Sequence, residues 1–253
     1  RLLIKSRSAP ATKFSSLRMT NKKLNLVVSS GAGISAESGI STFRDAGGLW
    51  ENYPVMDVAS ADGFERNPAL VHRFYNERRK ALGRTIPNRA HKILHELEEF
   101  FNVYVITQNV DDLHERAGST NVLHLHGELM KMRAVDEPSF IRPLPSYDAE
   151  TSVDTVVDRH HMRPHIVFFQ EAVPMFEPAT EIVEKADIFV IIGTSLVVYP
   201  AAALVRYVRP GVPVYYIDPN PGTNIPAGVH VIRAKATEGM AQLTEILKKQ
   251  LKA

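Results

Sequence analysis

The sequence predicts an α/β protein built on a doubly wound parallel sheet, with helices on both faces of the sheet. Short apolar runs rich in β-branched residues recur along the chain, and segments with apolar residues at three- and four-residue spacing lie between several of them. Buried strands that alternate with helices are typical of a parallel sheet. The expected strands are residues 24–29, 103–107, 122–125, 165–169, 188–193, 212–217 and 229–232. The expected helices are residues 89–101, 179–186, 201–208 and 239–250.

Two stretches interrupt this alternation of strands and helices. Residues 46–87 have the pattern of helices and loops, and the Asn67-Pro68 pair is typical of a helix start. Residues 128–164 are polar, contain prolines and show no clear period. With 253 residues and 44% apolar content, the chain is long enough for one large domain with a small insert. We expect the two stretches to form that insert.

The overall composition argues against several classes of function. The 30 basic and 28 acidic residues are well mixed and leave a net charge of +2, which gives no electrostatic case for binding nucleic acid. No apolar run approaches the roughly 20 residues of a membrane span, so we expect a soluble protein without a membrane partner. Cysteine is absent, which excludes disulfides, thiolate catalysis and thiolate zinc sites.

The first 18 residues differ in composition from the rest of the chain. They contain five basic residues, four serines and no acidic residue, which fits a transit peptide and a non-native upstream segment equally well. Met19 is a plausible natural start, so we interpret residues 1–19 as an extension outside the fold. A cytoplasmic location is expected, and residues 1–18 leave a mitochondrial or plastid address open.

Polar side chains follow two of the expected strands. The segment TQNVDDLHERAG places Gln108, Asn109 and Asp111 directly after an apolar strand. A second short strand leads into LHLHGEL, where His126 precedes a glycine. Carboxamide, carboxylate and imidazole groups at strand ends are what a site needs to bind a polar cofactor and to move a proton.

A glycine-rich turn, GAGISAESGI, follows the first expected strand and is expected to open a helix. Gly31 and Gly33 allow close approach of the backbone, and N–H groups at a helix N-terminus can bind a diphosphate. A G-x-G turn alone is weak evidence, because many α/β folds use glycine there only to turn. The continuation STFRDAGGLW carries Phe43, Arg44 and Asp45 on an expected loop, where the arginine either contacts a phosphate or carboxylate or faces solvent. Together, the turn and the polar strand ends predict a nucleotide-dependent enzyme.

Five motifs, in their order and spacing, resemble those of the sirtuins, the NAD-dependent protein-lysine deacylases. They are GAGISAESGISTFRD, TQNVDDLHERAG, the His126-Gly127 pair, RPHIVFF and GTSLVVYPAA. The resemblance extends from about Leu24 to Leu247 and implies a large Rossmann-like domain and a small domain, with NAD and acyl-lysine meeting in the cleft between them. It assigns to the NAD-binding domain residues 20–45, 88–127 and 165–253. It assigns to the small domain and the cofactor-binding loop residues 46–87 and 128–164.

The resemblance implies a role around NAD for each matching residue. The glycine-rich turn would line the pyrophosphate, the loop after it would cover the nicotinamide ribose, and the polar strand ends would form the ribose and nicotinamide pocket. Residues beyond later strands would contact the adenosine half, where Asp218 stands in place of the usual asparagine. The residues assigned to the cofactor are Gly31, Ala32, Gly33, Ala36, Glu37, Phe43, Arg44, Gln108, Asn109, Asp111, Gly193, Thr194, Ser195, Asp218 and Lys235.

The resemblance also implies the chemistry, with His126 as the general base and Asn109 and Asp111 as further catalytic residues. The acyl oxygen attacks the ribose carbon as nicotinamide leaves, and His126 then takes a proton from a ribose hydroxyl, which attacks the resulting imidate. The products would be free lysine, nicotinamide and O-acyl-ADP-ribose. A neutral imidazole with an ordinary pKa of about 6.5 suits this proton transfer at pH 7. We expect His124, by contrast, to be a core residue bonded to the backbone.

Tyr75 and Arg78 predict the acyl groups that are removed. They are three residues apart, hence on one helix face, and such a pair resembles the sirtuin class that removes succinyl, malonyl and glutaryl groups. A guanidinium binds a carboxylate through two hydrogen bonds, and a phenol donates one more. Ala46 matches the small residue that leaves room for a longer acyl chain in that class. The alternative is a surface arginine with Tyr75 packed in the small domain.

The expected partners are acyl-lysine proteins or peptides, and the expected state is a monomer. In the family the segment that matches Val167, Phe168 and Phe169 pairs with the extended substrate peptide as an added strand. Gln170 follows it where the family usually has glycine, and Asp112 stands where glycine or asparagine is common. Deacetylation is expected as a second activity, as in bacterial relatives of this type.

The chain departs from the family pattern most clearly in residues 128–164. Most sirtuins carry four cysteines there that bind a structural zinc ion, and this chain has none. The available polar residues form a weak cluster, because adjacent histidines do not easily face one ion, so we predict no metal site. These residues are Asp154, Asp158, His160 and His161. We expect the module to be held by the packing of Met130, Met132, Val135, Phe140, Ile141, Leu144, Tyr147, Val153, Val156 and Val157.

Three other functions remain to be weighed against a deacylase. An ADP-ribosyltransferase or NAD glycohydrolase on the same scaffold is disfavoured by His126 and by the Tyr75 and Arg78 pair. A non-catalytic module that senses NAD or ADP-ribose is disfavoured by the retention of Asn109, Asp111 and His126. A hydride-transfer dehydrogenase fits worst, because Ala36 stands where the third glycine of its motif is expected.

Overall fold

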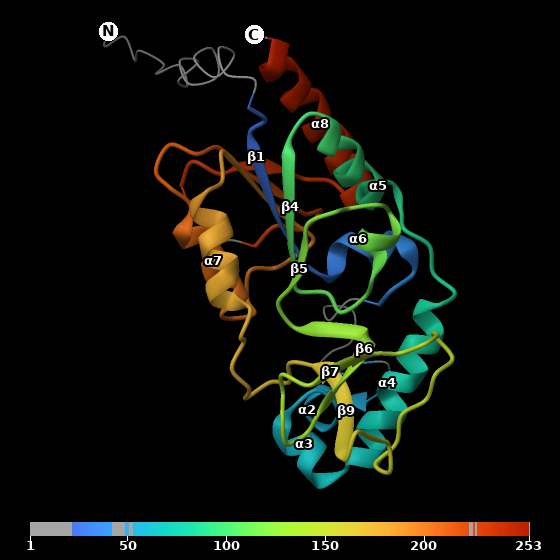
Figure 1. Cartoon of the computed structure of the whole chain (residues 1–253). Helices are drawn as coiled ribbons and strands as arrows, with labels where there is room; N and C mark the ends of the chain where they lie inside the picture. Colours follow the sequence, from blue (N-terminus) through green and yellow to red (C-terminus); the bar gives the residue numbers. More distant parts are fainter. Residues whose placement is uncertain (1–21, 42–48, 51–52, 223–224, 226, 253) are drawn as a thin grey trace, which may run out of the picture.

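The computed structural model of the protein describes residues 22–41, 49–50, 53–222, 225 and 227–252. A parallel sheet with helices on both faces forms the larger part, and a group of helices with an antiparallel sheet forms the smaller part (Figure 1). Six strands of the described chain make the parallel sheet, in the order β12-β11-β10-β1-β4-β5. Their bounds are Asn25–Ser30 for β1, Asn102–Thr107 for β4, Val122–His124 for β5, Ile188–Ile192 for β10, Val214–Ile217 for β11 and His230–Ile232 for β12.

Helices cover the parallel sheet on both faces, as the alternation in the sequence predicts. Successive side chains of a strand point to opposite faces, and the central strand β1 buries both. Val28 packs in the cluster under helices α5 and α8, whereas Val27 packs in the cluster under α7 and η5. These helices are Arg89–Glu96 for α5, Ala236–Lys252 for α8, Phe176–Glu184 for α7 and Ala201–Tyr207 for the 3-10 helix η5. The prediction of a doubly wound parallel sheet is therefore confirmed.

Three local predictions for the larger part are wrong. Residues 165–169 do not form a strand of the parallel sheet, because strand β9 (His160–Ile166) ends at Ile166 and pairs antiparallel with β6 in the smaller part. The glycine-rich turn does not open an α-helix but forms two short 3-10 helices, η1 (Ala32–Ile34) and η2 (Ala36–Ser38). The helix predicted at residues 201–208 is the 3-10 helix η5 (Ala201–Tyr207) instead of an α-helix.

The smaller part combines helices α2–α4 with an antiparallel sheet. Asn67 caps α4, because its side chain accepts a hydrogen bond from the Leu70 N–H (3.0 Å) and Pro68 follows at the first helical position. The apolar side of α4 packs on Phe168 of the segment after β9. The helices are Val55–Val58 for α2, Ala61–Arg66 for α3 and Pro68–Leu82 for α4. The sheet has the order β7-β6-β9-β8, with β6 at Gly127–Ala134, β7 at Ile141–Pro143 and β8 at Val156–Val157. The remaining elements are the pair β2 (Leu49–Trp50) and β3 (Tyr53–Pro54), the 3-10 helix η4 (Leu97–Glu99) and α6 (Leu113–Arg116).

The segment 128–164 is held by polar contacts to α4 as well as by apolar packing, in which the predicted Leu144 is buried and the predicted Tyr147 packs on the cluster around α4. Val135, Val153 and Val156 are exposed, which contradicts that prediction for these three residues. The fully buried Arg79 of α4 instead donates from Nε to the Leu129 carbonyl (2.9 Å) and from Nη1 to the Ala149 carbonyl (2.6 Å). A buried guanidinium that binds backbone carbonyls satisfies acceptors that would otherwise be buried without a partner.

The four residues weighed as metal ligands do not converge. His160 binds Asp136 (2.9 Å), and Asp158 binds Arg142 (3.4 Å). Within the described ranges, no group of three or more His, Cys, Asp and Glu side chains could hold a metal ion.

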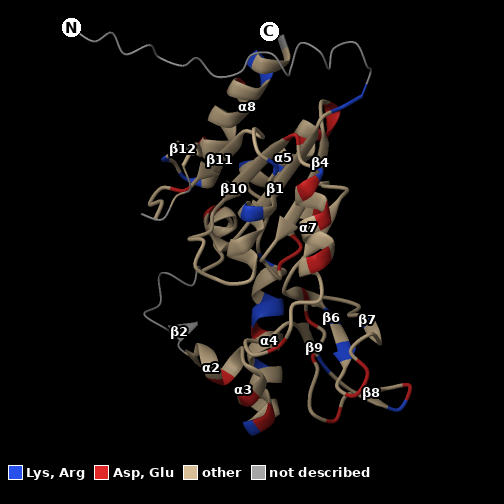
Figure 2. Ribbon diagram, turned by 90° about the vertical axis from the view of Figure 1, so that its left-hand side faces the viewer, with Lys and Arg blue, Asp and Glu red and all other residues tan. Residues whose placement is uncertain are grey.

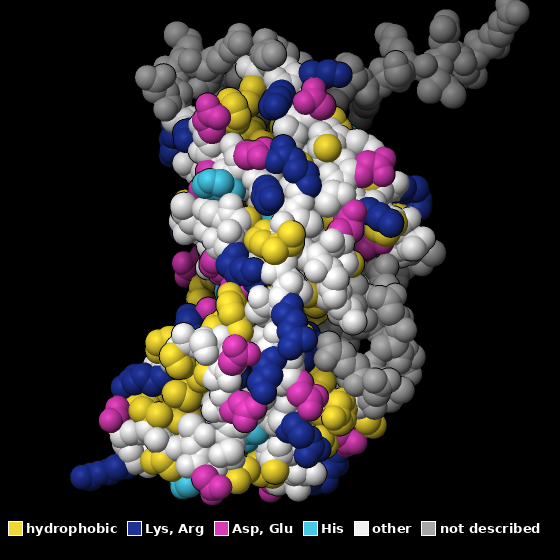
Figure 3. All heavy atoms as spheres, turned by 90° about the vertical axis from the view of Figure 1, so that its right-hand side faces the viewer, with side chains coloured by type: hydrophobic (Ala, Val, Ile, Leu, Met, Phe, Trp, Pro, Cys, Tyr) yellow, Lys and Arg dark blue, Asp and Glu magenta, His cyan; other side chains and the backbone are white. Residues whose placement is uncertain are grey.

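Charged side chains of both signs are spread over the molecule. The ribbon in Figure 2 marks acidic residues along α7, where Glu177, Glu181 and Glu184 are exposed. On the side shown in Figure 3, basic and acidic side chains lie interspersed among apolar and neutral ones. Among the described helices, none combines the length and apolar character needed to cross a membrane.

Candidate active site

The candidate site lies where the connections of the parallel sheet diverge. Strand β1 pairs with β10 on one side and with β4 on the other, so the chains that leave the carboxyl ends of β1 and β10 turn to opposite faces of the sheet. In open α/β sheets, this switch point is where ligands bind. Gly31 follows β1, Gln108 follows β4 and Gly193 follows β10, so the topology brings three of the predicted motifs to this edge.

Two glycine-containing loops contact each other at the switch point. The Gly31 N–H donates to the Ile192 carbonyl (3.0 Å), and the Gly33 N–H donates to the Gly193 carbonyl (2.8 Å). Gly193 has a left-handed backbone (φ +63°), and a Cβ added to it would lie 2.3 Å from the Ile34 nitrogen. Only glycine fits this approach, which leaves backbone rather than side chain at the edge where a diphosphate would lie.

The polar groups around these loops suit an NAD molecule. Gln108 Nε2 donates to Thr194 Oγ1 (3.3 Å), and Ser195 follows directly. Asp218 is buried just after β11, where its carboxylate accepts from the Asn220 N–H (2.8 Å). A carboxylate and hydroxyls can bind ribose hydroxyl groups, and a carboxamide side chain can bind the nicotinamide amide. The residues therefore fit the cofactor that the sequence predicts.

A hydroxyl group joins the two polar residues after β4. Ser35 Oγ accepts from Asn109 Nδ2 (3.1 Å) and donates to Asp111 Oδ2 (3.0 Å). Asp111 Oδ1 accepts from the Leu113 N–H (3.1 Å), and burial raises the pKa of the Asp111 carboxyl. Ser35 was not among the predicted site residues. Its position inside the glycine-rich motif was the only signal in the sequence.

His126 has one ring nitrogen anchored and the other available. Its Nδ1 lies 3.1 Å from the Gln108 carbonyl oxygen, which can only accept, so Nδ1 carries the proton and Nε2 carries the lone pair. Burial lowers the pKa of His126, although the bond to Gln108 partly opposes this effect. The ring is therefore neutral at pH 7, in the form that a general base needs.

This lowered pKa predicts the acid limit of activity. A base works only when neutral, so kcat/KM should fall as the pH drops through the pKa of His126 in the free enzyme. Because burial places that pKa below 6.5, we expect the acid limb of the pH profile below pH 6.5. Initial rates between pH 5 and 9 with NAD and acyl-peptide would measure it. A limb centred above pH 6.5 would contradict the assignment of His126 as a neutral base.

The segment after β9 is fixed beside His126. The Val167 N–H donates to the His126 carbonyl (2.9 Å), and the Phe169 N–H donates to the Ala59 carbonyl (2.8 Å). The Phe168 N–H donates to the Glu171 carboxylate (2.8 Å). Across the described residues, the hydrogen bonds leave the Val167 carbonyl without a donor, so it can accept one from a ligand.

Glu171 is a second site residue that the sequence did not reveal. Its carboxylate binds Arg163 Nη1 (2.7 Å) and Arg133 Nη2 (3.0 Å), and the Arg163 guanidinium lies 3.9 Å from the centroid of the Phe168 ring. Burial alone would raise the pKa of Glu171, but the bonds and charges of the two arginines hold it below its ordinary value. This charged cluster fixes the segment that was predicted to pair with substrate.

Tyr75 and Arg78 both lie in the interior of the smaller part. The Tyr75 ring is fully buried 6.1 Å from that of Phe168, and Arg78 is 7% exposed with its guanidinium 5.7 Å from the centroid of Phe74. The surface arginine of the alternative is therefore wrong, whereas its second part, Tyr75 packed in the small domain, is confirmed. Burial raises the pKa of the Tyr75 hydroxyl, which keeps it a neutral donor.

Other predicted site residues lie apart from this group or outside the described chain. Ala36 and Lys235 are exposed, and the Glu37 carboxylate binds the N–H (2.9 Å) and hydroxyl (2.8 Å) of Thr237 at the start of α8. Ala32 lies in η1 and is half-buried. The predictions for Phe43, Arg44 and Ala46 fall outside the described residues.

The two departures from the family pattern have defined contacts. Gln170 adopts a left-handed backbone (φ +76°), and its side chain donates to Asp62 (2.8 Å) at the start of α3. The Tyr147 hydroxyl donates to Asp112, which also pairs with Arg116 (3.5 Å). Tyr147 thereby joins the segment 128–164 to the loop after β4.

Comparison with known proteins agrees with this geometry. The Sir2 family model matches residues 31–200. The NAD-dependent protein deacylase of Bacteroides thetaiotaomicron is 57% identical over 228 residues, which cover 88% of this chain and 97% of that protein. A Sir2 homologue solved in complex with NAD has a TM-score of 0.80 and 35% identity, covering 97% of this chain and 98% of that one. A Sir2 protein bound to acetylated peptide has a TM-score of 0.72 and 29% identity, covering 92% and 98%. The chain, with its Rossmann-like parallel sheet, belongs to the Sir2 family.

Proposed function

We propose that this protein is an NAD-dependent protein-lysine deacylase that prefers succinyl, malonyl and glutaryl groups and also removes acetyl groups. Deacylase activity and NAD dependence follow from membership of the Sir2 family and from relatives that carry this name. The observation that carries the proposal is the position of His126. Its Nδ1 is bonded to the Gln108 carbonyl after β4, its Nε2 has no bonding partner among the described residues, and its backbone carbonyl is bonded to Val167 of the expected substrate segment.

The residues at the edge supply binding and proton transfer. NAD, when bound, supplies a glycosidic bond whose cleavage releases nicotinamide. Asn109 and Asp111, joined through Ser35, would hold the nicotinamide half, and Thr194 and Asp218 the adenosine half. His126 would accept a proton at Nε2 from a ribose hydroxyl. O-acyl-ADP-ribose and free lysine are the further products that we propose.

The Val167 carbonyl supports the binding of acyl-lysine. The N–H groups of Val167 and Phe168 are already bonded within the protein. The Val167 carbonyl between them can therefore accept a hydrogen bond from the amide N–H of a modified lysine. The 41% exposed Phe169 next to it provides apolar surface for a peptide. The proposed partners are therefore proteins or peptides that carry acyl-lysine.

The buried Tyr75 and Arg78 support a preference for acidic acyl groups. They lie on one helix, and Tyr75 packs on Phe168, whose backbone continues from Val167. A guanidinium shielded from water binds a carboxylate more strongly than an exposed one, because less solvent screens the charges. An acetyl group offers no carboxylate and gains nothing from this pair.

The first experiment measures nicotinamide release with NAD and one peptide carrying succinyl-lysine, acetyl-lysine or unmodified lysine. Arg78→Met should lower kcat/KM for the succinyl peptide by roughly 10- to 100-fold, since a hydrogen-bonded charge contributes about 1.5–3 kcal/mol. The acetyl peptide should change by less than about threefold. The matched control is Arg73→Met, an exposed arginine on the same helix.

The pattern across peptides decides between the functions. Equal losses for both acyl peptides would assign Arg78 a structural role and remove the acidic preference. Release of nicotinamide that does not require an acyl peptide would indicate an NAD glycohydrolase or ADP-ribosyltransferase. NAD binding without release would indicate a sensing module.

A further inference from the structure

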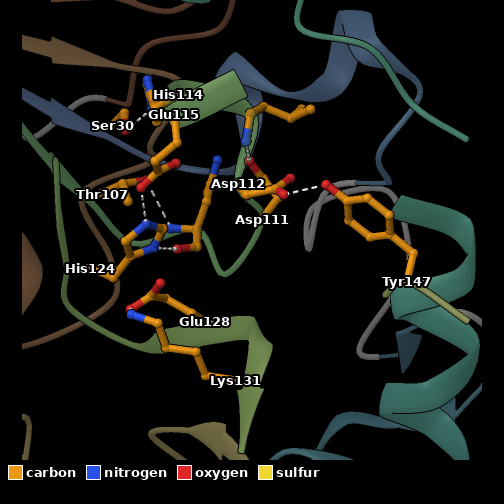
Figure 4. Close-up of polar contacts among 12 residues, drawn as sticks. Ser30, Thr107, Asp111, Asp112, His114, Glu115, His124, Glu128, Lys131 and Tyr147 are labelled. Carbon is orange, nitrogen blue, oxygen red and sulfur yellow. Dashed lines mark hydrogen bonds and ion pairs between the residues drawn. The ribbon is translucent and has the colours of Figure 1, made fainter. Parts of the chain in front are cut away.

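His124 lies between two groups that can only accept hydrogen bonds. Its Nδ1 is 2.9 Å from the Asn109 carbonyl oxygen, and its Nε2 is 2.8 Å from the Glu115 carboxylate (Figure 4). Its side chain is 7% exposed. A neutral imidazole has one N–H and can donate to only one of these acceptors. The geometry therefore requires a proton on each nitrogen, which makes His124 an imidazolium.

The charges that face His124 favour this form. Glu115 belongs to α6, and Glu128 belongs to β6, where it also pairs with Lys131 (2.7 Å). Burial alone would lower the pKa of His124, but Glu115, then Glu128 and the Asn109 carbonyl, together raise it above its ordinary value. The buried Asp111 and His114 are the other ionisable groups nearby, and the charge of His124 opposes the upward pKa shift of Asp111.

Two histidines bind consecutive carbonyls of the loop after β4. His124 binds the carbonyl of Asn109, and His126 binds that of Gln108, each through Nδ1. Their far nitrogens differ, because Nε2 of His124 meets a carboxylate and Nε2 of His126 meets no bonding partner among the described residues. The same residue type therefore supplies a fixed cation at one position and a neutral base two residues later.

We propose that His124 is a positioning residue, whose imidazolium is held by Glu115 and fixes the peptide that presents the Asn109 and Asp111 side chains to NAD. The inference rests on the proposed function, since it assigns the loop to the reaction named above. Loss of the proton from His124 would break one of the two hydrogen bonds. Either the loop would lose its anchor at the carbonyl of Asn109, whose side chain donates to Ser35, or the ring that holds this carbonyl would lose its own bond to Glu115.

Nitrogen NMR of the histidine rings tests the charge directly. In the wild-type protein at pH 7.5, we expect both ring nitrogens of His124 to be protonated, with His124→Gln used to assign the signal. Glu115→Gln should lower the pKa of His124 so that the ring is neutral at this pH. Glu181→Gln, an exposed carboxylate on α7, is the matched control and should leave the signal unchanged.

The role in positioning is tested on the same variants. In Glu115→Gln we expect kcat/KM to fall roughly 10- to 100-fold at pH 8, the scale of effect that small misplacement of reacting groups has. We also expect the alkaline limb of the pH profile to move to lower pH. Without the Glu115 carboxylate the pKa of His124 is no longer raised, so the ring loses its second proton at a lower pH. The affinity for NAD, measured by calorimetry, should weaken several-fold while the melting temperature changes little.

Two results would overturn the inference. One is a neutral His124 in the wild-type protein at pH 7.5. The other is a neutral His124 in Glu115→Gln with unchanged kcat/KM and unchanged NAD affinity. Failure of the proposed function is a separate result, because ring protonation and NAD affinity are measured without turnover. A wild-type protein that binds NAD and releases no nicotinamide would contradict the proposed deacylase activity. The protonation of the His124 ring and the affinity for NAD would still test the inference about His124.

Discussion

Replacing His126 by alanine should reduce kcat/KM for acyl-peptides by roughly 10²- to 10⁴-fold, the usual contribution of a general base. The ring is half-buried, neutral and held by the Gln108 carbonyl, so its Nε2 is the base that this edge offers to a ribose hydroxyl. Steady-state nicotinamide release with the succinyl and acetyl peptides would measure the loss. It should be the same for both peptides, because the proton is taken from the ribose and not from the acyl group.

His161→Ala is the matched control for this experiment. His161 lies exposed on β9, where its Nδ1 is 3.3 Å from the Val153 carbonyl, and its loss should leave turnover unchanged. In His126→Ala the affinity for NAD should stay within several-fold of the wild type. A loss of NAD binding as large as the loss of turnover would show that His126 shapes the pocket and would argue against its role as a base.

Gly193→Ala should lower the free energy of unfolding by roughly 2–4 kcal/mol and weaken NAD binding. An alanine in a left-handed backbone costs roughly 1–3 kcal/mol, and the added Cβ would lie 2.3 Å from the backbone nitrogen of Ile34, which cannot move aside without shifting the glycine-rich turn. For a chain of this length, the melting temperature should fall by about 5–15 °C. Thermal unfolding and calorimetric titration with NAD would measure the two effects.

Gly211→Ala separates the clash from the backbone strain. Gly211 has a similar left-handed backbone (φ +83°), but an added Cβ would have no other atom within 4 Å. It should therefore cost only the strain, about 1 kcal/mol, and leave NAD binding intact. Equal destabilisation by the two substitutions would show that the contact between the two glycine loops is looser than the structure has it.

Much of the parallel sheet could be predicted from the sequence, because its strands are buried on both faces. Runs such as Ile188–Ile192 are apolar throughout, which distinguishes them from the amphipathic helices between them. The run at 165–169 has the same character, yet it leads out of an antiparallel sheet. A short apolar run carries no information about its partner, so periodicity alone could not separate the two cases.

The sequence pattern gave only a weak signal for the antiparallel sheet, because two of its buried positions are occupied by arginines. Arg133 on β6 and Arg163 on β9 are each 8% exposed, and both bind Glu171 from beyond the end of β9. A pattern of apolar and polar residues marks such positions as surface. Their burial depends on a carboxylate that is distant in sequence from Arg133, which only the folded chain reveals.

The residues of the candidate site also fall into two groups, those that the sequence predicts and those that it does not. Gln108 and His126 could be predicted because the carboxyl ends of neighbouring parallel strands meet at one edge, so strand ends in the sequence become neighbours in space. Ser35 and Glu171 could not, because their roles consist of hydrogen bonds to residues far along the chain. The charge of His124 was equally hidden, although its expected bond to the backbone is confirmed.

The hydrogen bond from the Val167 N–H to the His126 carbonyl lies where the chain crosses between the two sheets in both directions. Gly127 begins β6 and pairs with Ile166 at the end of β9, so both crossings are joined at one point. The backbone of His126 is thus bonded directly to the segment proposed to bind substrate. The bond of its ring to the Gln108 carbonyl and the bond of its carbonyl to Val167 therefore make one residue the link between the cofactor edge and the substrate segment.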